Sequence, residues 1–399
     1  MFEQLDRVPD DPILGLMAAF RADGDARKVD LGVGVYRNDR GETPVLEAVR
    51  KAEQAVLARQ VSKAYVAPSG NPAFNQAIEQ LVFGASHPAL TAGRIRTLQS
   101  PGGCGALRVG AELIRVARPL TTIHVSTPTW ANHVPLLSGS GLELARYPYY
   151  DAATGGVSFA AMLDKIDQLP AASVVLLHGS CHNPSGADLS ETQWRELATV
   201  LSRRELVPYI DLAYQGLGLG LAEDAFGVRL LASELPELLV AVSCSKNFGL
   251  YRERTGALTL LGRTPAAADA GLSQLVRIAR TIYSMPPDHG AAVVAEVFAN
   301  SELASAWQRE LGTMRGRIQG LRAQLVAQLA QTCPERDFSF IERQRGMFSF
   351  LGVSTEQVRA LRERHHVYLT DDSRMNIAGL RAENIGYFAT AVAQVLRGA

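Results

Sequence analysis

Short apolar segments alternate with amphipathic segments from Leu98 to Leu261, and this alternation limits the folds open to the chain. A continuous apolar run such as Leu238 to Val242 is typical of a strand that a parallel sheet buries on both faces. Upstream, Asn71 stands where it can cap a helix. Strands that alternate with helices predict an α/β fold with a mostly parallel sheet, in which ligand-binding residues gather at the strand ends along one edge.

The composition is that of an ordinary globular protein of 399 residues, long enough for one large domain and a smaller one. The 40 basic residues balance the 40 acidic ones, so we expect no nucleic-acid partner and no membrane association. No segment reaches the ~18 apolar residues of a membrane span, and the acidic N-terminus does not resemble a signal peptide. The four cysteines have neither a CxxC pair nor metal-ligand spacing, which predicts free thiols, no metal site and a cytoplasmic location.

Lys246 is notable because only five of the 40 basic residues are lysines. It follows the apolar run Leu238 to Val242 within the segment SCSKNFGLYRER, which places its amine near the end of a buried strand. A desolvated lysine loses its proton readily and can attack a carbonyl group, whereas a guanidinium cannot form a Schiff base. On these residues alone, a surface lysine beside two incidental serines is an equally good interpretation.

Three further segments place glycine or polar residues at the ends of expected strands. The turn at Gly102 and Gly103 leads into an amphipathic helix whose free N–H groups and dipole suit a phosphate, although helices also begin after glycine without binding one. Asp211 ends the apolar run in LVPYIDLAYQG, where a carboxylate needs a partner. Asn183 lies in the polar cluster that follows another apolar run. All of these are expected along the same edge of the sheet.

The ends of the chain differ from this central region. Residues 1–14 contain two prolines and several acids, which predicts an extended arm that contacts a partner subunit. A Pro-Pro pair and the long helix that follows it are the best candidates for a domain boundary. We therefore expect a large domain at 46–311 and a small α+β domain formed by 15–45 and 312–399.

The order of these motifs resembles the class I aminotransferases of the aspartate and aromatic amino acid group, which use pyridoxal 5'-phosphate (PLP). The resemblance covers nearly the whole chain and rests on the segments DPILGL, LGVGVYR, GGCGALRVGA, TWANH, HGSCHNPSG, DLAYQG, SCSKNFGLYRER, YSMPPDHG, GMFSF and SRMNIAG. It implies a fold-type I PLP transferase, whose large domain holds a mostly parallel, seven-stranded sheet between helices. It also implies a homodimer with shared active sites.

The resemblance implies a catalytic role for Lys246, Asp211 and Tyr214. Lys246 would hold the cofactor through a Schiff base and then carry a proton between the substrate and the cofactor. Asp211, supported by His133, would pair with the pyridinium nitrogen and keep it protonated. Tyr214 would hydrogen-bond the phenolic oxygen of the cofactor, together with Asn183.

Other residues would bind the cofactor without taking part in proton transfer. Trp130 would stack on the ring and lie beside the substrate. The phosphate would be held by Gly102, Gly103, Cys104, Ser243, Ser245 and Arg254, with Tyr65 reaching in from the second subunit. Cys104 departs from the family, in which serine or threonine is usual, and a thiol is the weaker donor.

Substrate carboxylates would be held by two arginines. Arg374 would clamp the α-carboxylate with help from the backbone at Gly34. Arg280, contributed across the dimer interface, would pair with the side-chain carboxylate of aspartate or glutamate. The expected substrate-binding residues are Gly34, Trp130, Asn183, Arg280, Phe348 and Arg374.

The residues around this pocket indicate a broad substrate range. Val35, Arg37 and Thr43 resemble residues of aspartate-preferring relatives, whereas the small Ala64 and the deformable Met285 give an aromatic ring room. We expect an amino group to move between aromatic amino acids or aspartate and 2-oxoglutarate by a ping-pong mechanism. A strict aspartate aminotransferase, a PLP lyase or decarboxylase on the same fold, and a non-enzymatic effector domain are the alternatives. An effector domain of this fold would carry an N-terminal DNA-binding extension, and residues 1–14 are too short and too acidic for one.

Overall fold

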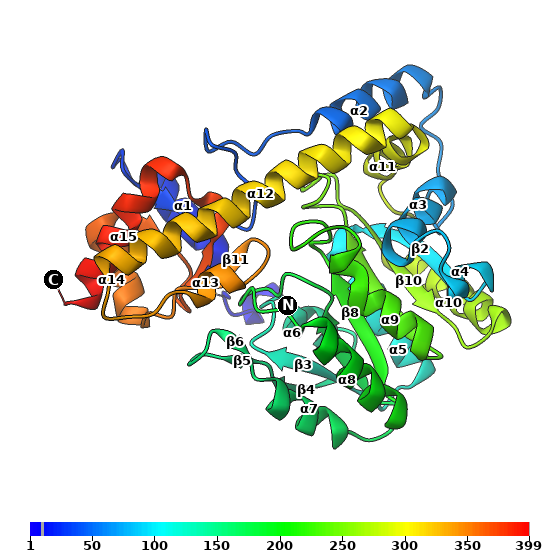
Figure 1. The fold of residues 1–399 in the computed structure, drawn as a ribbon. Helices are drawn as coiled ribbons and strands as arrows, with labels where there is room; N and C mark the ends of the chain where they lie inside the picture. The colour runs from blue at the N-terminus through cyan, green and yellow to red at the C-terminus, as the bar shows by residue number, and fades with distance from the viewer. Residues whose placement is uncertain (9–11, 399) are drawn as a thin grey trace. The chain divides into compact units, whose positions relative to one another are not determined.

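The computed structural model describes residues 1–8 and 12–398, which form two compact units (Figure 1). The sheet unit contains Pro44–Gly316 and Gln344–Gly346, and the terminal unit contains Met1–Thr43, Arg317–Arg343 and Met347–Ala399. The domains expected at 46–311 and at 15–45 with 312–399 stay predictions, since compactness alone does not define an independently folding domain.

The arm expected at residues 1–14 is only partly described. Its first eight residues are exposed, with one 3-10 turn at Phe2–Gln4, and residues 9–11 lie outside the described part of the chain. Helix α1 (Pro12–Ala22) then begins inside the range expected for the arm. Proline is well tolerated at the first helical position because its missing N–H would have no helical partner there.

The sheet unit is built on a seven-stranded sheet in the order β2-β10-β9-β8-β7-β3-β4. The strands in chain order are β2 (Ile95–Pro101), β3 (Thr122–Thr127), β4 (Glu143–Pro148), β7 (Val174–His178), β8 (Val207–Leu212), β9 (Leu238–Ser243) and β10 (Thr255–Leu261). Only β10 runs against its neighbours β2 and β9, so the prediction of a mostly parallel sheet is confirmed with this one exception. Every residue of β7, β9 and β10 is buried, as their apolar composition predicts.

Besides the first part of α12 (Ser301–Thr332), the helices of this unit are α2 (Glu47–Arg59), α3 (Pro72–Phe83), α4 (Pro88–Thr91), α5 (Gly102–Ala117), α6 (His133–Ser138), α7 (Phe159–Asp167), α8 (Glu191–Arg203), α9 (Phe226–Glu234), α10 (Pro265–Ile282) and α11 (His289–Ala299). The core lies where α5 and α10 pack on the sheet, with Leu107 and Leu275 meeting Leu258 in one buried cluster. The Asn71 side chain accepts hydrogen bonds from the first turn of α3, so the predicted cap is confirmed.

The register of the parallel strands brings their carboxyl ends together. His178 at the end of β7 lies opposite Asp211 in β8, and Asp211 lies opposite Ala241 in β9. The antiparallel β10 adds the glycine turn, because Thr255 pairs with Pro101, the residue before α5. Segments more than 150 residues apart in sequence therefore meet at one edge.

The terminal unit contains two small sheets and the helices around them. β1 (Val29–Asp30) pairs in parallel with β12 (Val367–Tyr368), and β11 (Phe348–Phe350) pairs antiparallel with β13 (Arg374–Asn376). Its helices are α1, the part of α12 (Ser301–Thr332) from Arg317 on, α13 (Phe340–Arg343), α14 (Thr355–His365) and α15 (Ala382–Leu396).

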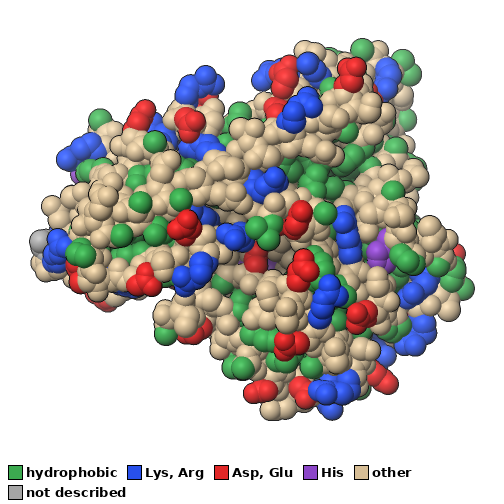
Figure 2. All heavy atoms as spheres, viewed as in Figure 1, with side chains coloured by type: hydrophobic (Ala, Val, Ile, Leu, Met, Phe, Trp, Pro, Cys, Tyr) green, Lys and Arg blue, Asp and Glu red, His purple; other side chains and the backbone are tan. Residues whose placement is uncertain are grey.

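On the face that Figure 2 shows, acidic and basic groups are interspersed, in keeping with the equal numbers of each in the sequence. Among the described residues, no helix combines the length and the apolar character that crossing a membrane requires.

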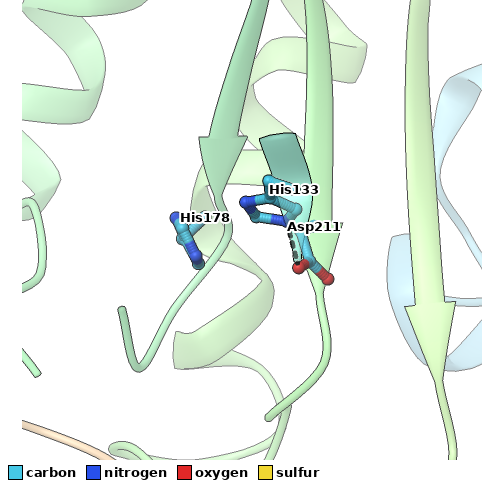
Figure 3. A group of neighbouring side chains, drawn as sticks. All are labelled: His133, His178 and Asp211. Carbon is cyan, nitrogen blue, oxygen red and sulfur yellow. Dashed lines mark hydrogen bonds and ion pairs between the residues drawn. The ribbon is translucent and has the colours of Figure 1, made fainter. Parts of the chain in front are cut away.

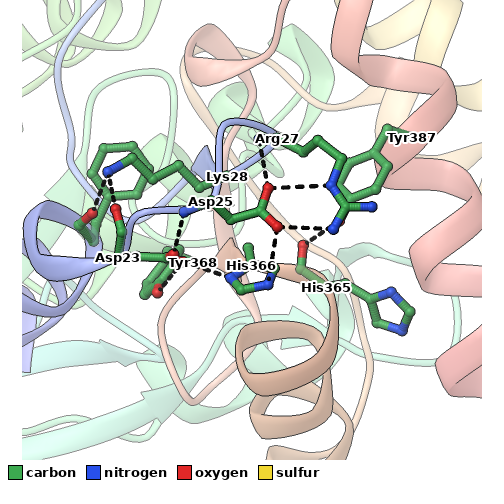
Figure 4. Close-up of polar contacts among 9 residues, drawn as sticks. Asp23, Asp25, Arg27, Lys28, His365, His366, Tyr368 and Tyr387 are labelled. Carbon is green, nitrogen blue, oxygen red and sulfur yellow. Dashed lines mark hydrogen bonds and ion pairs between the residues drawn. The ribbon is translucent and has the colours of Figure 1, made fainter.

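A polar cluster ties the end of α1 to β12 and the end of α14 (Figure 4). His366 contacts the Oδ2 atoms of Asp23 at 2.8 Å through Nδ1 and of Asp25 at 3.3 Å through Nε2. The Tyr368 hydroxyl donates to Asp23 at 2.7 Å, and Arg27 forms an ion pair with Asp25. The cluster therefore joins the segment that leads into β1 to the start of β12.

This cluster predicts a pH-dependent contribution to stability from Asp23. The Asp25 backbone N–H, then Tyr368 and His366, lower the pKa of Asp23 from 3.8 to about 2. Because the folded-state pKa lies below the ordinary value, the stabilisation is complete above that value and disappears as the pH falls through about 2. Asp23→Asn should lower the melting temperature at pH 7, and its difference from wild type should shrink across that acidic range. Exposed Asp164→Asn is the control, and a difference that stays constant with pH would contradict the prediction.

Candidate active site

Lys246 lies three residues beyond the end of β9, at the edge where the strand ends meet. It is partly exposed, and its Nζ lies 4.9 Å from the centroid of the Tyr214 ring. Burial of the amine lowers the pKa of Lys246, against the opposing effect of the Asp211 carboxylate. A lysine with a lowered pKa is deprotonated more easily and so is a better nucleophile and base.

Asp211 forms a buried pair with His133 (Figure 3). Nε2 of His133 lies 3.0 Å from Oδ2 of Asp211, and Nδ1 lies 2.7 Å from the Thr129 hydroxyl. A hydrogen bond donated by Thr129 to Nδ1 leaves the proton on Nε2, where it is donated to Asp211. Burial alone would raise the pKa of Asp211, but the His133 hydrogen bond, with the charges around it, holds that pKa below its ordinary value.

His178 is the third member of the group in Figure 3. One ring nitrogen each of His133 and His178 and one carboxylate oxygen of Asp211 lie within 4.8 Å of one another. Burial lowers the pKa of His178 to about 3. His178 is therefore neutral at physiological pH and leaves the Asp211 carboxylate as the charged group of the set.

The glycine turn at the start of α5 forms a cradle with residues at the end of β9 and just before β10. Gly102 has φ +69°, and a Cβ added there would lie 2.6 Å from Nη2 of Arg254. A Cβ on Gly103 would lie 3.2 Å from the Cβ of Ser243. Ser245 donates its backbone N–H to the Ser243 hydroxyl at 3.2 Å. Glycine is thus needed at position 102, where the helix N-terminus, the Arg254 guanidinium and the Ser243 side chain converge, an arrangement that suits a phosphate.

The other expected cofactor residues of the sheet unit differ in their burial. Tyr214 and Asn183 are buried, and Nδ2 of Asn183 lies 3.4 Å from the Tyr214 hydroxyl. Trp130 is partly buried and makes an edge contact with the His133 ring at 5.3 Å between centroids. Cys104 is partly buried, with Sγ 3.9 Å from Nδ2 of Asn132.

Two expected residues stand apart from this group within the single chain. Tyr65 is 93% exposed, and Arg280 is exposed and donates a hydrogen bond to the Ser284 hydroxyl. Within the described chain, neither is hydrogen-bonded to Lys246 or Asp211. Both were expected to act across a dimer interface, and exposure in one chain is the condition for that.

Three of the expected substrate-binding residues, Arg374, Phe348 and Gly34, come together in the terminal unit. Arg374 in β13 is 6% exposed and donates from Nη2 to the Gly32 carbonyl at 2.8 Å. Its guanidinium carbon lies 4.6 Å from the centroid of the Phe348 ring. Phe348 also lies against Gly34, where an added Cβ would be 2.9 Å from Cζ of the ring.

Comparison with known proteins agrees with this geometry. Residues 26–392 match the family "Aminotransferase class I and II". The chain belongs to this family. An aromatic-amino-acid aminotransferase of Pseudomonas aeruginosa is 46% identical over 99% of this chain and 98% of its own length. An aspartate aminotransferase of Escherichia coli is 43% identical over 99% of this chain and all of its own length.

A solved structure of the same family has a closely similar fold. The crystal structure of an aromatic-amino-acid aminotransferase from Burkholderia pseudomallei, covalently bound to pyridoxal phosphate, matches with a TM-score of 0.97 and 44% identity over 99% of both chains. The resemblance to class I aminotransferases and the predicted fold-type I architecture are therefore both confirmed.

Sequence reasoning missed two supporting residues of this aminotransferase. Thr129 lies four residues before His133, one helical turn in spacing, which could have indicated their contact. Asp188 accepts the backbone N–H groups of Cys181 at 2.7 Å and His182 at 2.9 Å, and so braces the loop that carries Asn183. Its only sequence signal is a carboxylate shortly after a Pro/Gly turn, which is common in loops that bind nothing.

Proposed function

We propose that this aminotransferase uses PLP to move an amino group between an L-amino acid, either aromatic or aspartate, and 2-oxoglutarate or glutamate. The observation that carries the proposal is the position of the Lys246 amine at the same sheet edge as the buried Asp211–His133 pair. The names of relatives from both the aromatic and the aspartate groups support the broad substrate range.

The donor set fits the three polar parts of PLP. The Lys246 amine suits the aldehyde, and the Asp211 carboxylate suits a protonated pyridine nitrogen. The start of α5 with Arg254 suits the phosphate, and a side chain at Gly102 would fill that cradle.

When bound, PLP supplies an aldehyde that captures amines and a ring that accepts electron density from the substrate α-carbon. Lys246 would hold the cofactor and would take the α-proton of the substrate as a neutral base, which its lowered pKa favours. Asp211, kept ionised by the hydrogen bond from His133, would hold a proton on the pyridine nitrogen of the cofactor. Tyr214 and Asn183 would donate hydrogen bonds to the phenolic oxygen of the cofactor.

We assign the substrate carboxylates to two arginines. Arg374, already oriented by the Gly32 carbonyl and the Phe348 ring, binds the α-carboxylate through its planar fork of N–H groups. Arg280 of a second chain pairs with the side-chain carboxylate of aspartate or glutamate.

A homodimer in the cytoplasm is part of the proposal. Apolar residues that follow α2 or lie near its end are unusually exposed, with Leu57 at 74%, Val61 at 100% and Tyr65 at 93%. A second copy of the chain would cover them and bring Tyr65 to the phosphate. The four free cysteines favour a reducing compartment. Sedimentation of the holoenzyme tests the dimer, and a monomer at micromolar concentration would contradict it.

The function is tested by a half-reaction. The visible absorption of the PLP-bound enzyme is followed after aspartate or, separately, phenylalanine is added without an oxo acid. We expect both amino acids to bleach the visible absorption band of the bound cofactor, because Ala64 and Met285 leave room for an aromatic ring of the substrate. Bleaching by aspartate alone would indicate a strict aspartate aminotransferase. Release of carbon dioxide or ammonia, instead of a new amino acid once 2-oxoglutarate is added, would indicate a decarboxylase or lyase.

A further inference from the structure

A buried arginine on α12 hydrogen-bonds strand β11 in the terminal unit. Arg322 is 1% exposed, and its guanidinium donates three hydrogen bonds of 2.7 Å. Nη1 donates to the Ile341 carbonyl and the Ser349 hydroxyl, and Nη2 donates to the Phe348 carbonyl. The side chain thus joins α12 to α13 and to two consecutive residues of β11.

Burying the Arg322 guanidinium at this place is energetically unfavourable in itself. Removing a cation from water costs free energy, and an apolar side chain of similar volume often replaces a buried charged group without loss of stability. What the guanidinium adds is a rigid, planar set of donors that holds several acceptors at fixed angles. The oxygens of Ile341, Phe348 and Ser349 that accept these hydrogen bonds all belong to the segment that leads into and forms β11.

The residue that Arg322 holds is the one against which Arg374 lies. Phe348 is 2% exposed, and its ring lies against both the backbone at Gly34 and the Arg374 guanidinium. β11 also pairs with β13, where Phe350 lies opposite Arg374. A shift of β11 would therefore move both the ring and the strand that orient Arg374.

We propose that Arg322 is a positioning residue for the substrate-carboxylate site. By holding the Phe348 carbonyl and the Ser349 hydroxyl, it fixes the Phe348 ring and, through the ring, the angle of the Arg374 guanidinium. A bidentate arginine–carboxylate pair needs two parallel hydrogen bonds, so a small rotation of the guanidinium weakens it. The inference rests on the proposed role of Arg374.

The test uses 3-phenylpropionate, which carries a carboxylate, and its neutral amide, 3-phenylpropionamide. Dissociation constants for the PLP-bound holoenzyme are measured by calorimetry. Arg322→Met keeps an unbranched buried side chain and removes the hydrogen bonds to Ile341, Phe348 and Ser349. We expect it to weaken 3-phenylpropionate binding about tenfold and to leave amide binding unchanged, because only the carboxylate needs the oriented fork. Arg322→Lys, which keeps the charge without the planar fork, should give an intermediate loss.

Two variants separate positioning from general destabilisation. Arg397→Met is the matched control, since Arg397 also braces α12, through the Thr332 carbonyl at 2.7 Å, and has no hydrogen bond to β11 among the described residues. It should change the melting temperature without changing the dissociation constant. Ser349→Ala removes a single acceptor of Arg322 and should weaken carboxylate binding about threefold. If Arg322→Met does not fold, Ser349→Ala decides the question.

Arg374→Ala distinguishes failure of this inference from failure of the proposed function. If Arg374→Ala leaves 3-phenylpropionate binding unchanged, the proposed carboxylate clamp is wrong. If Arg374→Ala weakens binding but Arg322→Met and Ser349→Ala bind like wild type, the role of Arg322 is wrong and the clamp stands. Equal weakening of acid and amide by Arg322→Met would also overturn the positioning role.

Discussion

Lys246→Ala should lower the turnover number by about 10⁴-fold, the upper range for loss of a positioned acid–base group. The reason is that one amine would serve two purposes, as the covalent attachment of the cofactor and as the base that takes the α-proton. Neither Tyr214 nor Asp211 can replace the Lys246 amine in these roles, since both are proposed to hold the ring of the cofactor. The measurement is turnover with aspartate and 2-oxoglutarate at saturating PLP.

Lys246→Arg separates nucleophilicity from charge. Arginine keeps a cation at the strand end but stays protonated at any accessible pH, so this variant should be as inactive as Lys246→Ala. Lys165→Ala removes an exposed lysine at the end of α7 and is the control. Substantial turnover by Lys246→Arg would show that the charge, and not the amine, is what the site requires.

Asp211→Asn should lower turnover by about 10²- to 10⁴-fold, because it removes the charge that keeps the pyridine nitrogen protonated while leaving the shape of the side chain unchanged. His133 would then face a neutral amide in place of a carboxylate. PLP binding should weaken as well, since the charged hydrogen bond to the ring nitrogen is lost.

Asp211→Glu and Thr129→Val provide the controls for this prediction. Asp211→Glu keeps the charge but shifts its position, so its activity should lie between those of wild type and Asp211→Asn. Thr129→Val removes the hydroxyl that contacts Nδ1 of His133 at 2.7 Å and should have a much smaller effect. Wild-type turnover by Asp211→Asn would mean that the carboxylate only supports the fold around His133.

Many strands and helices could be predicted because local sequence patterns indicate them. Uninterrupted apolar runs such as Leu238–Val242 match strands that are buried on both faces, and Asn71 caps α3 as its position indicated. The pattern did not reveal that β10 runs antiparallel, because an apolar run reads the same in both directions. The sequence thus determined which segments form strands and helices, but not the direction of every strand.

The chemical character of the site was likewise present in the sequence. A lone lysine after a buried strand, a carboxylate at a strand end and a glycine turn before a helix each point to a function that only special residue types perform. The roles of these residues stay predictions until the variants are measured. The resemblance of the chain to a family came from the order of motifs along its whole length. The physical chemistry of any single segment does not reveal that order.

Only the tertiary structure decided which of these residues meet. Arg254 reaches the glycine turn because Thr255 in β10 pairs with Pro101 in β2, a register set across about 150 residues of chain. Arg322 reads in sequence as one more arginine of a long helix, and its burial against β11 appears only after folding. Local sequence determines secondary structure and chemical type because both depend on neighbouring residues. Convergence of distant side chains depends on strand register and packing, which no single segment contains.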